Sequence, residues 1–218
     1  MEYRQYGKQK DLLSIIAFAG IVLKDESAED SNKYVSWAIE HGVNYFDVAP
    51  GYGNAQNMLG PALHPFRHNV FLACKTKHRT GVESRADLEN SLKVLQTDYF
   101  DLYQLHAMTT EEDFKLATGP GGALDAILKA KEEGIIRHIG FSAHSAEVAV
   151  KLMRIFDFDS ILFPVNFTTW FEAGFGPKIM DEAEKLNVSR LALKSAAHYK
   201  LKPGQDRPRQ KCWYAPIE

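Results

Sequence analysis

The sequence is poor in the features that mark several specialised protein classes. It has two cysteines, Cys74 and Cys212, too few for a disulfide framework and without the spacing of a metal site. Both are expected to be free thiols. The longest strongly apolar run, residues 15–23, is about half of the ~20 residues that a helix needs to cross a bilayer. The first residues show no signal-peptide pattern. These shortages predict a cytoplasmic protein with no membrane partner.

Charge of one sign is also scarce. Lys and Arg number 26 and Asp and Glu number 28, which gives a formal net charge of -2. The two signs are mixed along the chain, so neither a basic stripe for nucleic acid nor an acidic tail is present. The hydrophobic content of 45% is enough for a substantial core. A single domain spanning residues 1–218 with no nucleic-acid partner is therefore expected.

The chain does contain a repeated pattern of short apolar runs. These runs have the length of a strand and return about every 30 residues, separated by segments long enough for a helix. They lie at residues 14–20, 43–49, 70–76, 99–106, 137–143, 160–166 and 190–196. The segments between them show helical spacing of apolar residues, as in residues 83–96, where Leu88, Leu92 and Leu95 share one face. Further helices are expected at residues 34–42, 123–134, 145–156 and 177–186. The pattern predicts an α/β fold with parallel strands.

Two α/β architectures accommodate these strands. Runs such as residues 70–74 are continuously apolar, as in strands covered on both faces. An open nucleotide-binding sheet predicts G-x-G-x-x-G after its first strand, whereas this chain has Ala19-Gly20-Ile21-Val22 there. A (β/α)8-type TIM barrel is favoured, incomplete and with about seven of its βα units. Residues 1–13 are expected to form a short N-terminal hairpin and residues 196–218 an irregular C-terminal tail.

Four polar residues follow or end the early strands of this pattern: Asp47, Tyr52, Lys75 and His106. The carboxyl ends of barrel strands meet at one mouth, so these side chains are expected to share a pocket. Asp47 and Lys75 are expected to form a buried ion pair, and Lys75 is expected to stabilise the phenolate and so lower the pKa of Tyr52 from its usual ~10. His106 is expected to hydrogen-bond a carbonyl oxygen of the substrate. Such a pocket suits carbonyl reduction with Tyr52 as the proton donor.

The same residues carry a family resemblance. The segments HGVNYFDVAPGYGNAQ, VFLACKT, LQTDYFDLYQLH and GIIRHIGFSAHS resemble the aldo-keto reductases, in which motifs like GVNYFDTAxxYG, a strand-end K-T, D-x-x-x-x-H and G-x-S occur in this order. The resemblance implies an oxidoreductase that reduces an aldehyde or ketone by hydride transfer from NADP(H). It further implies that Tyr52 is the general acid, that Lys75 and Asp47 tune it, and that His106 orients the carbonyl.

The resemblance also implies cofactor-binding residues: Ser142, Asn166, Lys194 and Ser195. Ser142 matches the serine that reaches the nicotinamide carboxamide, although Ala143 stands where many members have Asn. Asn166 replaces the usual Gln, and Lys194 and Ser195 end the seventh strand. The chain stops at Glu218 without an eighth strand or the basic stretch that binds the 2′-phosphate. The barrel would then have open edges. Three explanations are considered: a sequence that ends early, a partner subunit that covers the open edge, or a naturally degenerate protein.

Three rival functions are compatible with the sequence. A metal-dependent hydrolase could use Asp47, His106 and His144, but the first strand lacks the usual H-x-H pair. A Schiff-base aldolase could use Lys75 or Lys194 as its nucleophile. The third is a catalytically degenerate barrel that acts as a binding or regulatory subunit.

Overall fold

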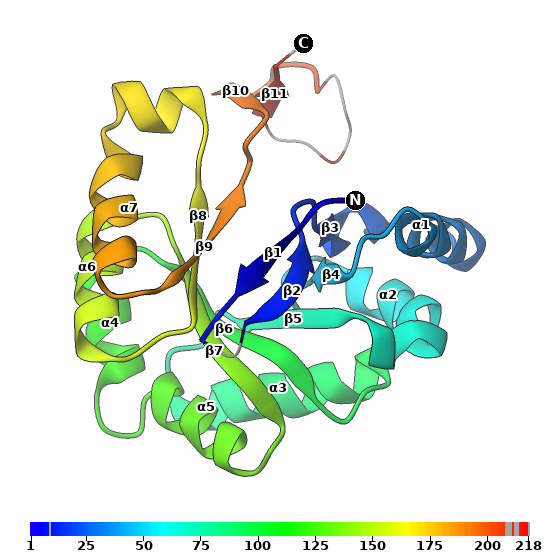
Figure 1. The fold of residues 1–218 in the computed structure, drawn as a ribbon, viewed down its shortest axis with the longest axis horizontal. Helices are drawn as coiled ribbons and strands as arrows, with labels where there is room; N and C mark the ends of the chain where they lie inside the picture. Colours follow the sequence, from blue (N-terminus) through cyan, green and yellow to red (C-terminus); the bar gives the residue numbers. More distant parts are fainter. Residues whose placement is uncertain (9, 208–210, 212–213, 218) are drawn as a thin grey trace.

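The computed structural model describes residues 1–8, 10–207, 211 and 214–217. Within them, parallel strands β3 to β9 form a seven-stranded curled sheet in strict chain order, and helices cover its outside (Figure 1). The strands are β3 (Phe18–Ala19), β4 (Tyr45–Asp47), β5 (Phe71–Thr76), β6 (Phe100–Met108), β7 (Ile136–Ala143), β8 (Ser160–Pro164) and β9 (Ser189–Leu193). Each overlaps a predicted run, so the α/β prediction is confirmed. In the described part of the chain, β3 and β9 are the edges of the sheet, which is curled but not a closed eight-stranded barrel.

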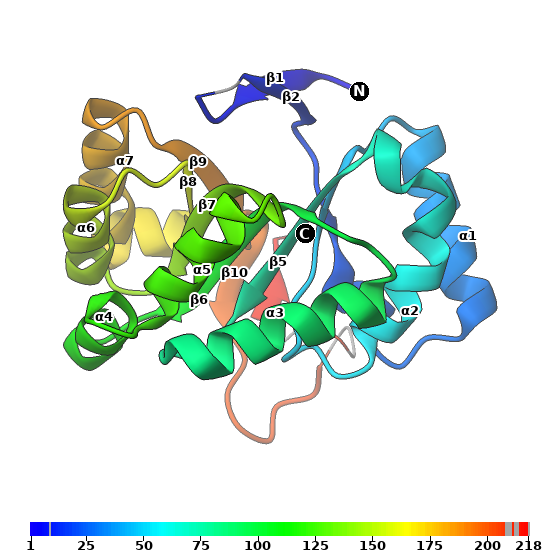
Figure 2. The same cartoon turned by 90° about the horizontal axis from the view of Figure 1, so that it is seen from below.

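Helices alternate with the strands and lie around the outside of the curl (Figure 2). They are α1 (Ala28–Glu40), α2 (Ala55–Leu63), α3 (Gly81–Leu95), α4 (Glu111–Thr118), α5 (Ala123–Glu132), α6 (Ala146–Ile155) and α7 (Phe175–Lys185), with the short turns η1 (Gly20–Leu23), η2 (His64–Asn69) and η3 (Thr168–Glu172). Side-chain caps begin α1 and α3, where Ser27 accepts from the Asp30 amide and Thr80 from the Glu83 amide. The predicted helices α1, α3, α5, α6 and α7 are confirmed.

Sequence reasoning missed α2 and α4. Helix α2 contains Gly60 and Pro61, which ordinarily argue against a helix. Gly60 lies where α2 crosses α3, and a Cβ there would lie 2.5 Å from the carbonyl oxygen of Val94. The close approach of the two helices therefore requires glycine. Helix α4 begins with a capping box between Thr110 and Asp113, a local signal that was present in the sequence.

Alternation along the strands divides the core into two layers. On β5, Leu72 and Cys74 face the helices, whereas Phe71 and Ala73 belong to a second cluster inside the curl. Tyr6 of the N-terminal hairpin packs into that second cluster. The interior of the curl is thus filled by side chains from both the sheet and the hairpin.

The predicted N-terminal hairpin is present as β1 (Tyr3–Tyr6) and β2 (Asp11–Ser14). The Tyr6 hydroxyl donates to Ser160 Oγ at 2.9 Å, and the Gly7 amide donates to Ser189 Oγ at 2.8 Å. Ser160 and Ser189 begin β8 and β9. The hairpin therefore lies against the amino ends of the strands, opposite the end where the candidate site is expected.

The C-terminal segment differs from the predicted irregular tail. Strands β10 (Ala197–Lys200) and β11 (Tyr214–Pro216) form an antiparallel hairpin at the end of the molecule away from β1 and β2 (Figure 2). Its anchors are tertiary: Thr168 Oγ1 donates to the His198 carbonyl at 2.6 Å. The prediction of an irregular tail did not include these two short strands, because a contact of this kind leaves no local pattern in the sequence.

The structure tests the prediction of a free thiol at only one of the two cysteines. Cys74 is free and buried in β5, whereas Cys212 and the terminal Glu218 lie outside the described residues. As to membranes, no helix in the described ranges combines the length and apolarity that a spanning segment needs.

Candidate active site

A buried ion pair lies at the carboxyl ends of β4 and β5. Lys75 Nζ contacts Asp47 Oδ1, and the two side chains are 1% and 15% exposed. Adjacent parallel strands place them side by side, since β4 and β5 are paired in the sheet. Gln104 Nε2 donates to the other oxygen of Asp47 at 3.2 Å. The structure therefore brings the predicted Asp–Lys pair together and adds an amide that fixes the carboxylate.

Tyr52 and His106 lie next to this pair. Tyr52 follows β4, in a turn where its amide donates to the Ala49 carbonyl at 3.1 Å. Lys75 Nζ lies 5.3 Å from the centroid of the Tyr52 ring. The ring of His106 meets the Tyr52 ring edge to face, with centroids 6.0 Å apart. All four predicted residues thus share one neighbourhood.

The pKa of Tyr52 is raised above its ordinary value. Burial is the main cause; the charge of Lys75 acts in the opposite direction but does not outweigh it, and the charge of Asp47 raises the pKa further. The prediction that Lys75 lowers the pKa of Tyr52 below ~10 was therefore wrong, because it considered the ammonium without the burial and the nearby carboxylate. At neutral pH the phenol holds its proton, as a proton donor must.

Lys75 and His106 have defined charge states. Burial alone would lower the pKa of Lys75, but the charge of Asp47 and its hydrogen bond to the ammonium raise it overall, so Lys75 is an ammonium. Burial, with the charges of Lys75 and neighbouring cations, lowers the pKa of His106 to about 3. His106 is therefore a neutral imidazole. Its Nδ1 is buried and has no hydrogen-bond partner in the described part of the chain.

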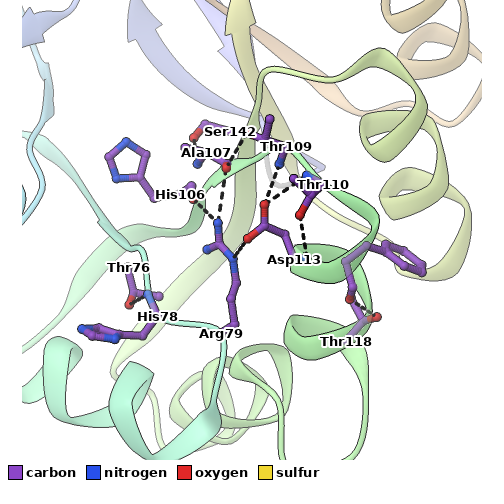
Figure 3. Close-up of polar contacts among 11 residues, drawn as sticks. Thr76, His78, Arg79, His106, Ala107, Thr109, Thr110, Asp113, Thr118 and Ser142 are labelled. Atoms are coloured by element: carbon purple, nitrogen blue, oxygen red, sulfur yellow. Dashed lines mark hydrogen bonds and ion pairs between the residues drawn. The ribbon is translucent and has the colours of Figure 1, made fainter.

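A backbone irregularity follows His106. The register between β6 and β7 shifts between Leu105 and Met108, and Ala107 has a left-handed conformation with φ of 54°. An L-residue in this region costs about 1–2 kcal/mol, so surrounding contacts must hold it. The Ala107 amide donates to Ser142 Oγ at 2.7 Å, and Arg79 Nη2 donates to the carbonyls of His106 and Ala107 (Figure 3).

The predicted cofactor residues lie at the carboxyl ends of β7, β8 and β9 or just beyond them. Ser142 is buried near the end of β7. Asn166 follows β8; its Oδ1 accepts from the Thr169 amide at 2.9 Å and its Nδ2 donates to the Lys194 carbonyl at 3.3 Å. Lys194 has a left-handed backbone, and burial lowers its pKa. Ser195 is exposed in the turn after β9. The cofactor candidates thus share the end of the sheet that carries Asp47 and Lys75.

These groups fit a nicotinamide carboxamide in part. Ser142 Oγ accepts from the Ala107 amide, and its own proton has no acceptor among the residues placed by the structure. That hydroxyl can donate to a carboxamide oxygen. The Asn166 amide, by contrast, already fixes the loop after β8. The fit therefore depends chiefly on Ser142.

Two residues at the site were missed by sequence reasoning. Gln104 lies two residues before His106 on β6, and strand alternation puts the two on one face. This two-residue spacing from His106 could have identified Gln104 from the sequence. Arg79 lies in the loop after β5 and had no such signal, because its partners, two backbone carbonyls and the Asp113 carboxylate, are distant in sequence.

The metal-dependent rival requires a cluster of ligands. Within the residues that the structure describes, no three His, Cys, Asp or Glu side chains come together in a geometry that could hold a metal ion. Asp47, His106 and His144 do not form such a group.

The chain matches known proteins over most of its length. The model of the Aldo/keto reductase family matches residues 20–212. "Uncharacterized oxidoreductase YqkF" of Bacillus subtilis is 32% identical over 139 residues, which are 57% of this chain and 44% of that protein. "Aldo-keto reductase YhdN" of the same species is 26% identical over 193 residues, or 80% of this chain and 54% of that protein. The chain thus spans about half the length of these curated relatives.

Solved structures show the same fold. Aldo-keto reductase AKR11C1 from Bacillus halodurans has a TM-score of 0.75 at 23% identity, over 88% of this chain and 65% of that one. A Bombyx mori aldo-keto reductase in complex with NADP has a TM-score of 0.70 at 20% identity, over 93% of this chain and 69% of that one. Together with the match over residues 20–212, the seven-stranded curl and the gathered motif residues establish the relationship. This chain belongs to the aldo/keto reductase family.

Proposed function

We propose that this chain reduces an aldehyde or ketone with NADPH, using Tyr52 as the proton donor. The observation that carries the proposal is the buried pair of Asp47 and Lys75 against a protonated Tyr52. A protonated phenol beside a fixed ammonium is suited to protonating an oxygen that gains negative charge. The family's general activity on carbonyls supports the same chemistry.

Each residue has a defined part in this proposal. As charge develops on the substrate oxygen, the Tyr52 hydroxyl donates its proton, and the ammonium of Lys75 stabilises the phenolate that forms. Asp47, held by Gln104, keeps Lys75 charged and in place. His106 is neutral, so its imidazole orients the carbonyl oxygen by hydrogen bonding without competing as an acid.

NADP(H) is the proposed cofactor, and when bound it supplies the hydride. Ser142 would hold its carboxamide through the hydroxyl proton, with Asn166 as a second and weaker contact. Lys194 and Ser195, which follow the seventh strand of the sheet, would contact the nucleotide. The cationic side chain of Lys194 is suited to a phosphate group.

A direct test is titration with NADPH and with NADP+ while nicotinamide fluorescence is followed. Saturable binding, together with NADPH oxidation that depends on an added aldehyde, supports the proposal. A chain that binds neither nucleotide would contradict it and would favour the degenerate binding or regulatory subunit. Borohydride trapping of a carbonyl compound on Lys75 or Lys194 would indicate an aldolase instead. Lys75 is a poor nucleophile, because its ion pair with Asp47 and its raised pKa keep the amine protonated.

A further inference from the structure

Arg79 is a largely buried cation that contacts the backbone around His106 (Figure 3). It lies in the loop between β5 and α3, and its side chain is 13% exposed. Nη2 donates to the carbonyl oxygen of His106 at 2.9 Å and to that of Ala107 at 3.3 Å. Nε donates to Asp113 Oδ1 at 2.8 Å. One guanidinium therefore holds two consecutive carbonyl groups and one carboxylate.

Asp113 fixes the guanidinium from the other side. Its second oxygen accepts from the backbone amides of Thr109 and Thr110 at 3.2 and 3.0 Å, where α4 begins. Burial alone would raise the pKa of Asp113, but the hydrogen bonds and charge of Arg79 and the backbone donors hold it at about 2. Arg79 is thus anchored to the start of a helix by a permanent carboxylate.

Ala107 connects these contacts to two candidate site residues. It follows His106 in the chain, and its amide donates to Ser142 Oγ at 2.7 Å. Its carbonyl accepts from Arg79 and from Thr109 Oγ1, the latter at 2.9 Å. Because alanine prefers negative φ, its left-handed conformation depends on these bonds.

We propose that Arg79 is a positioning residue that sets His106 and Ser142 together through Ala107. If the two carbonyls are released, Ala107 relaxes, the His106 ring turns relative to Tyr52, and Ser142 Oγ loses the amide that orients it. The inference rests on the proposed function, in which His106 orients the carbonyl and Ser142 the nicotinamide. If Arg79 only tethered α4 to the loop, the conformation of Ala107 would not matter.

The test uses Arg79→Lys, which keeps the charge but lacks the planar fork. We expect kcat to fall on the order of ten- to a hundredfold, because His106 and Ser142 would be misplaced relative to the substrate and cofactor. NADPH should bind more weakly, and the His106 ring resonances in NMR spectra should be displaced. Adding Ala107→Gly should restore most of the kcat and the His106 resonances, because glycine adopts positive φ without strain. The matched control is Arg85→Lys, whose guanidinium pairs with Glu89 on α3 and with Glu133 directly after α5. It should change none of the three readouts.

Recovery in the double variant supports the proposal. Absence of recovery in a double variant that melts at the wild-type temperature overturns it. If Arg79→Lys does not fold, Asp113→Asn takes its place with the same Ala107→Gly partner, because it keeps the guanidinium and removes the charge of its anchor.

The His106 resonances can be measured without any cofactor. If wild type binds no NADPH, the proposed function fails, but Arg79→Lys and Ser142→Ala must still each displace those resonances; if either leaves them unmoved, the coupling is refuted.

Discussion

Tyr52 and His106 meet edge to face, with ring centroids 6.0 Å apart and ring planes at 90°. The edge of an aromatic ring is its positive part, so this arrangement fixes both rings without a hydrogen bond between them. The ring contact itself uses no polar atom of either side chain. A substrate oxygen between the phenol and the imidazole is the group that the proposed chemistry requires.

Removal of the phenol hydroxyl tests the proton donor. Tyr52→Phe should lower kcat for carbonyl reduction by about 10²–10⁴-fold, the usual contribution of a positioned acid. The dissociation constant for NADPH should change little, because the ring and its contact with His106 are kept. Steady-state kinetics and nucleotide titration measure the two effects. Wild-type turnover in this variant would mean that the proton comes from another group.

The rate of reduction should be nearly independent of pH from about 5 to about 10. Tyr52 has a raised pKa and keeps its proton, Lys75 has a raised pKa and stays charged, and the pKa of His106, about 3, leaves it neutral over the whole range. The rate should fall only above the ordinary phenol pKa of ~10, as Tyr52 ionises. A profile of kcat/KM against pH measures this, and a decline centred below pH ~8 would contradict the assignment.

The buried ion pair should be costly to break from one side. Lys75→Met leaves the Asp47 carboxylate buried without its cation and should lower the free energy of unfolding by about 3–5 kcal/mol. The double variant Asp47→Leu/Lys75→Met should be more stable than Lys75→Met alone, because no unpaired charge is left. Urea unfolding of the wild type, both single variants and the double variant completes the cycle. Equal stability of Lys75→Met and wild type would show that the pair is not buried as described.

His138 should make the docking of the N-terminal hairpin depend on pH. Its Nε2 lies 2.8 Å from Asp11 Oδ2 on the hairpin, and its Nδ1 lies 3.3 Å from Asp159 Oδ1. Burial alone would lower the pKa of His138, but Asp159 and Asp11 raise it overall. The stabilisation of the fold by protonated His138 is therefore fully present below the pKa of ~6.5 that a histidine has in the unfolded chain. It is lost as the pH rises through the pKa of His138 in the folded protein.

The measurement is the free energy of unfolding in urea at a series of pH values. It should decline above pH ~6.5 in the wild type, and His138→Gln should remove that decline. His41→Gln, at the exposed end of α1, serves as the matched control and should keep it. The same pH dependence in wild type and His138→Gln would rule out His138 as its source.

The strands and the four gathered residues could be predicted because their signals are local. An apolar run of strand length followed by Asp47 or Lys75 needs only short-range information, and parallel topology then brings the ends of the strands together. Gln104 was equally accessible, since it lies two residues before His106 on the same strand.

Other features depend on contacts between distant segments. The left-handed Ala107 is held by Arg79, 28 residues away in sequence, and alanine itself gives no sign of that conformation. The direction of the Tyr52 pKa shift depends on how deeply the ring is buried, which the sequence does not state. Helix α2 was missed because Gly60 breaks the local pattern, although the crossing with α3 requires it.

Cys74 gives the centre of the sheet a built-in chemical reporter. It is fully buried on β5, one residue before Lys75, and burial raises the pKa of its thiol to about 12. The thiolate is the form of cysteine that attacks an alkylating reagent, so modification of this position by iodoacetamide must wait until β5 separates from the helices that cover it. In a Cys212→Ser background, the labelling rate would therefore record how often the middle of the protein opens.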